Sequence, residues 1–82
     1  MAALAETIAA HARAFAPDAV RMRRDLHRHP EIAWTERRTT YRIAEALSAD
    51  GHDPQVRADL VGLTVEVGSG MPVVGFRADI DA

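Results

Sequence analysis

The spacing of the apolar residues changes near Gly51, and this change most limits what the chain can fold into. Before Gly51, apolar side chains recur every three or four residues, the spacing that gathers them on one side of a helix. After Gly51 they alternate with polar residues, as in a strand with one buried face. We therefore expect an α/β arrangement in which N-terminal helices pack on one side of a small sheet.

Two helices are predicted before Pro30. The first should end near Phe15, and its apolar side consists of Leu4, Ile8, Ala12 and Phe15. Pro17 suits the first turn of a second helix, because the N–H that proline lacks is not needed there. Pro30 disfavours helical geometry at the residue before it, so the second helix should end at His29.

A third helix is predicted between Thr35 and about Ala49. Thr35 is a suitable N-cap, Glu36 lies in the first turn where the helix dipole favours an acid, and Gly51 suits the position that ends the helix. Trp34, the only tryptophan, stands just before this helix. We expect it to anchor the packing of helix on sheet rather than to form a ligand platform.

The strands are predicted after Gly51. Leu63–Val67 alternates strictly, and Val73–Ala78 is an apolar run that we expect to bury Phe76. The glycines around Ser69 mark a turn, so these two segments should form a hairpin at the centre of the sheet. Gln55–Ala58 is a candidate for a further short strand.

The composition excludes several classes of protein. A chain of 82 residues can form one small domain with a thin core, and a net charge of −2 gives no general attraction to nucleic acids or acidic membranes. The sequence contains no cysteine, which excludes disulfides and thiolate chemistry within it and fits the cytoplasmic location that we expect. We predict no secretory signal and no membrane partner, since no apolar run approaches membrane-spanning length.

Arginines and histidines cluster before Pro30. Arg21–Arg28 could form a nucleic-acid-binding face, but the acidic net charge favours a solvated helix surface whose arginines pair with acids such as Asp25. His27 and His29 resemble a metal-binding pair. Residues two apart on a helix face away from each other, so a structural role at the helix end is favoured for both.

Asp79 and Asp81 are the candidate site residues. They follow the apolar run, and on an extended backbone they point to the same face. Acidic groups at the end of a buried strand are a common way for α/β proteins to build a site. Two carboxylates alone bind a transition metal weakly compared with imidazole or thiolate ligands.

Two segments resemble signatures of one enzyme superfamily. Leu26–Glu31 (Leu-His-Arg-His-Pro-Glu), with Glu36, Thr39, Ile43, Leu47 and Gly51 after it, is similar to the opening signature of the zinc-type amidohydrolases of the aminoacylase and carboxypeptidase superfamily. Phe76–Ala82 (Phe-Arg-Ala-Asp-Ile-Asp-Ala) resembles the second signature of the branch that contains hippurate hydrolase, N-acyl-amino-acid deacylases and plant auxin-conjugate hydrolases. The sequence departs from that branch at Leu60–Leu63, where Thr-Gly-Val is usual.

The resemblance implies a protein of which residues 1–82 are only a part. They would be the N-terminal part of a larger zinc-peptidase-like catalytic domain, without the remainder of that domain or its inserted dimerisation domain. The implied activity is metal-dependent hydrolysis of the amide bond of an N-acyl amino acid or related conjugate, by a homodimer or higher oligomer that uses zinc, manganese or cobalt. The piece alone is expected to bind no metal and to be inactive.

The resemblance also suggests roles for the two acids. Related peptidases have His-x-Asp where this chain has Asp79-Ile80-Asp81, so Asp79 replaces a metal-binding histidine and Asp81 matches the carboxylate that orients it. Both are therefore expected to orient neighbouring groups, with direct metal binding by Asp79 and Asp81 as the less favoured alternative. For the whole chain, the alternatives are a stand-alone interaction module or an Arg-rich nucleic-acid-binding domain.

Overall fold

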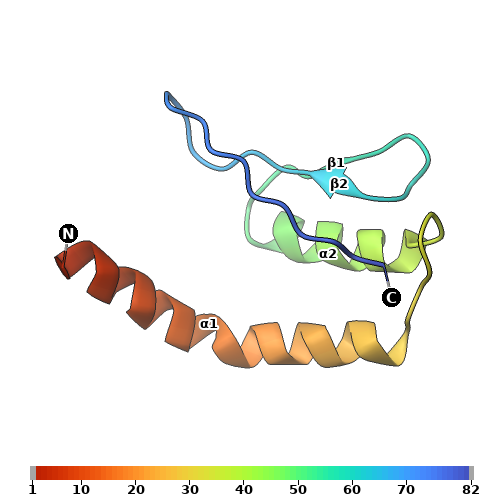
Figure 1. Cartoon of the computed structure of the whole chain (residues 1–82), viewed down its shortest axis with the longest axis horizontal. Helices are drawn as coiled ribbons and strands as arrows, with labels where there is room; N and C mark the ends of the chain where they lie inside the picture. The colour runs from red at the N-terminus through yellow and green to blue at the C-terminus, as the bar shows by residue number, and fades with distance from the viewer. Residues whose placement is uncertain (1, 82) are drawn as a thin grey trace.

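The computed structural model describes residues 2–81 as two helices and one small antiparallel sheet. Figure 1 shows their order along the chain, which is α1 (Ala2–Arg28), α2 (Arg37–Ala49), β1 (Gln55–Val56) and β2 (Leu63–Thr64). The helices come first and the strands follow, as the change of spacing near Gly51 predicts. Neither of the helices described is both long enough and apolar enough to cross a membrane.

Helix α1 is continuous where two helices were predicted. Pro17 lies inside it, so the prediction of a helix end near Phe15 is wrong. Proline fixes a φ angle close to the helical value, and its cost is one lost hydrogen bond and crowding that usually bends the helix. Figure 1 shows such a bend between the two halves of α1. The helix ends at Arg28, close to the end that Pro30 predicts.

Helix α2 confirms the third predicted helix and its C-terminal stop. Gly51 has a φ of +86°, a left-handed value that glycine adopts readily. The N–H of Gly51 donates to the carbonyl of Ser48 at 3.0 Å, and the N–H of His52 donates to that of Leu47 at 3.0 Å. These two bonds form a Schellman motif, which satisfies carbonyls that the helix leaves without partners.

The start of α2 differs from the prediction. Glu36, not Thr35, occupies the N-cap position, and its own side chain makes no capping hydrogen bond. The Thr35 hydroxyl instead donates to the carbonyl of Ile32 at 2.7 Å. The carboxylate that caps this helix comes from Glu31, as described below.

The sheet is smaller than predicted and is paired differently. β2 covers only the start of the predicted strand Leu63–Val67, and it pairs with β1, within the candidate strand Gln55–Ala58. Val73–Ala78 forms no strand, so the predicted central hairpin is wrong. The register places Gln55 opposite Thr64 and Val56 opposite Leu63. A short loop joins β1 to β2, and the Arg57 N–H donates to the Gly62 carbonyl across it at 3.0 Å. Because the loop is short, bringing the two strands together costs little chain entropy.

No apolar side chain is fully buried among residues 2–81; the buried residues are Glu36, Thr39 and Thr40. Phe76 is 99% exposed, which contradicts its expected burial. The radius of gyration is 14.6 Å, whereas a compact chain of this length has about 12 Å. The described helices and strands therefore leave their apolar faces without a shared core, and polar contacts near the start of α2 join them instead.

Candidate functional site

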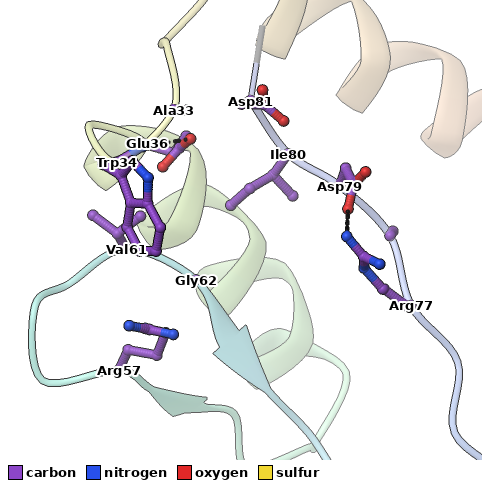
Figure 2. A pocket seen from close by; sticks show the side chains of 11 residues that line it. Ala33, Trp34, Glu36, Arg57, Val61, Gly62, Arg77, Asp79, Ile80 and Asp81 are labelled. Carbon is purple, nitrogen blue, oxygen red and sulfur yellow. Dashed lines mark hydrogen bonds and ion pairs between the residues drawn. The ribbon is translucent and has the colours of Figure 1, made fainter.

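Two open hollows lie where the C-terminal segment passes the start of α2. The larger, of about 410 Å³, is lined by Ala33, Trp34, Glu36, Arg57, Val61, Gly62 and residues 77–81 (Figure 2). The smaller, of about 260 Å³, is lined by Arg23, Leu26, His27, Pro30, Glu31, Thr39, Ile80 and Asp81. Ile80 and Asp81 line both hollows, so residues from both resembled signatures meet at this place.

Glu31 caps helix α2 from the preceding connector. Its Oε1 accepts hydrogen bonds from the Thr39 N–H at 2.6 Å and the Thr39 hydroxyl at 2.8 Å, and its Oε2 accepts one from the Arg38 N–H at 3.2 Å. A carboxylate is favoured here because the first N–H groups of a helix have no partners within it and carry partial positive charge. The last residue of the Leu26–Glu31 segment is thus tied to the first turn of α2.

These hydrogen bonds also set the protonation of Glu31. Desolvation by its surroundings raises the pKa, but the donors from Thr39 and Arg38 outweigh that effect and hold the pKa of Glu31 below its ordinary value. Each of these bonds favours the charged carboxylate over the neutral acid. Glu31 is therefore an anion in the folded chain at neutral pH.

Asp25 links the end of α1 to α2. Arg38 donates to its two carboxylate oxygens at 3.0 and 3.1 Å, and Arg42 Nε lies 3.5 Å from Oδ2. The hydrogen bond from Arg38 is the main cause that holds the pKa of Asp25 below its ordinary value. Asp25 therefore pairs with arginines of α2 rather than with its neighbours in Arg21–Arg28, where Arg21 pairs with Asp18.

The two histidines considered as a metal pair do not come together with other ligands. His29 Nδ1 lies 3.0 Å from the Asp25 carbonyl, within hydrogen-bonding distance, and His27 lines the smaller hollow. Across residues 2–81 the structure contains no group of three or more His, Asp or Glu placed to hold a metal ion. The residues present do not form a ligand set, and a metal at this surface would need ligands from other residues.

Asp79 and Asp81 both lie at the rim of the larger hollow and are exposed. Arg77 donates to the Asp79 carboxylate at 2.9 Å, with side-chain exposures of 87% and 70%. Figure 2 shows Ile80 directed toward the Trp34 side of the hollow and the Asp79 carboxylate facing Arg77. The structure therefore brings the two acids to one region without giving either a buried, enclosed environment.

Trp34 and Arg57 form a contact that the sequence did not indicate. Trp34 is 74% exposed, so its predicted role as a packing anchor is wrong. The Arg57 guanidinium lies 5.8 Å from the centre of the Trp34 ring, within the range of a cation–π interaction. The backbone N–H of Trp34 donates to Glu36 Oε1 at 3.0 Å, which helps to hold the connector. No local pattern predicts this pair, because the two residues are distant in the sequence.

Thr40 joins α2 to the loop before β2. Its buried hydroxyl donates to the Glu36 carbonyl at 2.6 Å and accepts from the Gly62 N–H at 2.8 Å. One side chain therefore satisfies groups from two separate segments. This contact fixes the Gly62 side of the larger hollow relative to α2.

Comparisons with known proteins relate the chain to parts of two longer proteins. It is 35% identical over 74 residues to N-acetylcysteine deacetylase of Bacillus subtilis (strain 168). This match covers 85% of the present chain and 19% of the deacetylase. It is 41% identical over 64 residues to putative glutamate--cysteine ligase 2-3 of Rhodococcus jostii (strain RHA1). That match covers 77% of the present chain and 8% of the ligase. No family model and no solved structure matches it.

The chain matches only a small part of each relative. The chain spans about a fifth of the deacetylase and less than a tenth of the ligase. The two names describe different reactions, a deacetylation and a ligation. The chain is thus a distant relative of one segment of a deacetylase, in agreement with the amidohydrolase resemblance of its two signature segments.

Proposed function

We propose that this chain is the N-terminal part of the catalytic domain of a metal-dependent amidohydrolase. The whole protein would cleave the amide bond of an N-acyl amino acid or related conjugate, as a cytoplasmic homodimer. The observation that carries this proposal is the 35% identity to N-acetylcysteine deacetylase over 85% of the chain. The segments Leu26–Glu31 and Phe76–Ala82 also support it through their resemblance to amidohydrolase signatures.

The exposed apolar side chains support the view that further residues complete the domain. Among residues 2–81 none of the apolar side chains is fully buried, and Val73, Val74 and Phe76 are 78%, 85% and 99% exposed. Removing such side chains from water is the main driving force of folding. In our proposal, the rest of the catalytic domain covers this segment.

Asp79 and Asp81 would act by orienting other groups. Neither belongs to a ligand set within residues 2–81, so we assign no catalytic step to the residues described here. Carboxylates beside a metal site commonly fix the orientation of its ligands. The zinc, manganese or cobalt ion of the whole protein would be bound by residues that lie elsewhere.

Two purified proteins test the proposal: the 82-residue chain and the product of the gene's reading frame extended beyond Ala82. Each is incubated with N-acetylcysteine or hippurate and with zinc, manganese or cobalt, and the released amino acid is measured. We expect metal-dependent release by the extended product and none by the chain alone. An extended product that folds and binds metal but hydrolyses no N-acyl amino acid would contradict the proposed activity.

The second candidate is a stand-alone interaction module, which the many exposed apolar side chains also favour. The two candidates differ in the gene itself. A messenger RNA with a stop codon directly after Ala82 would favour the module, whereas a continuing frame favours the enzyme.

A further inference from the structure

The C-terminal segment, residues 71–81, has a backbone free to pair. No backbone–backbone hydrogen bond involves these residues within the part of the chain described, residues 2–81. Figure 1 shows the segment as an irregular tail that returns toward α2 without joining the sheet. Such a row of unpaired N–H and C=O groups is a template for strand pairing.

The side chains of residues 76–81 divide into two chemically distinct sets. On an extended backbone, Phe76, Ala78 and Ile80 share one face, whereas Arg77, Asp79 and Asp81 share the other. Phe76 is 99% exposed, so the apolar face lacks cover at that end. The Arg77–Asp79 ion pair at 2.9 Å is the only side-chain hydrogen bond that this segment makes among the described residues.

The order of these residues makes the segment complementary to itself. In an antiparallel pair of two copies with its two-fold axis at Ala78, Arg77 of one copy stands opposite Asp79 of the other. The same register sets Phe76 opposite Ile80 on the other face. Opposite charges and apolar groups in directly facing positions each stabilise an antiparallel pair.

We propose that the 82-residue chain forms a dimer by antiparallel pairing of residues 75–81 with the same residues of a second copy, centred on Ala78. The register produces two Arg77–Asp79 pairs and two Phe76–Ile80 contacts, related by symmetry. Charge complementarity selects a second copy as the occupant, because the segment carries both signs in the order that self-pairing needs. The inference concerns the 82-residue chain by itself, in which nothing else covers this segment among the described residues, and it does not rest on the proposed function.

A charge-exchange series tests the register. The dissociation constant of the dimer is measured by analytical ultracentrifugation from low micromolar to millimolar concentration for the native chain, Arg77→Asp, Asp79→Arg and the double exchange. Each single exchange places like charges opposite each other twice, and we expect it to weaken the dimer about tenfold or more. The double exchange restores opposite charges and should recover the native constant.

Arg13→Asp is the matched control, because it changes the net charge as Arg77→Asp does but lies on α1. It should leave the dissociation constant unchanged. Circular dichroism of each variant verifies that helix content is retained. A native chain that stays monomeric at all concentrations, assembles into open fibrils, or dimerises equally well after either single exchange would overturn the proposal.

Discussion

Glu31 receives both donors of Thr39: the backbone N–H at 2.6 Å and the hydroxyl at 2.8 Å. This relationship connects the connector after α1 to the first turn of α2, and Thr39 is 3% exposed. It gives the acid at position 31 a structural role in this chain.

Replacing Glu31 should destabilise the start of α2. Glu31→Ala removes the acceptor of three hydrogen bonds at the helix N-terminus, and loss of a helix cap costs about 1 kcal/mol. We expect a lower midpoint of urea unfolding, followed by circular dichroism at the helix band. Glu45→Ala, a change on the same helix outside this cluster, is the control; an equal effect of both would contradict the capping role.

Acid should weaken the same contact. Because the folded-state pKa of Glu31 lies below its ordinary value, its contribution to stability is complete above the ordinary glutamate pKa of about 4.3 and is lost as the pH falls through the lower, folded-state pKa. The amide proton of Thr39 should show this titration by NMR. In Glu31→Gln the pH dependence at Thr39 should vanish, while the Asp25–Arg38 pair keeps its own response in both proteins.

Thr40→Val should be more damaging than its small change of shape suggests. It removes the hydroxyl that accepts from the Gly62 N–H and donates to the Glu36 carbonyl. A buried donor or acceptor that loses its hydrogen-bond partner costs about 1–3 kcal/mol, so the free energy of unfolding should fall by that amount. Thr40→Ser keeps the hydroxyl and is the matched control. Hydrogen exchange at Gly62 should accelerate in the valine variant only.

Phe76→Ala should change the stability of the monomeric chain by less than about 0.5 kcal/mol. The side chain is 99% exposed, whereas loss of a buried phenylalanine costs about 3–5 kcal/mol. Thermal unfolding at low micromolar concentration measures this. A large loss of stability under these conditions would show that Phe76 packs inside the monomer after all.

Local chemistry determined the parts of the fold that were predicted well. Pro30 ends α1 close to the expected residue, and Gly51 ends α2 in a left-handed turn, because each acts through its own backbone geometry. The change from helical to alternating spacing places helices before strands in the same way. Pro17 shows the limit of this approach, since a proline compatible with a helix start is also tolerated, with a bend, inside a longer helix.

Tertiary structure decided what depends on partners that are distant in the sequence. Asp25 pairs with Arg38 of the next helix, and Arg57 lies over Trp34; both contacts require the chain to return on itself. The same is true of Phe76, whose apolar run reads as a buried strand but has no neighbouring strand among residues 2–81. The pattern of residues predicts which face of a strand is apolar. Burial of that face depends on whether another segment is present to cover it.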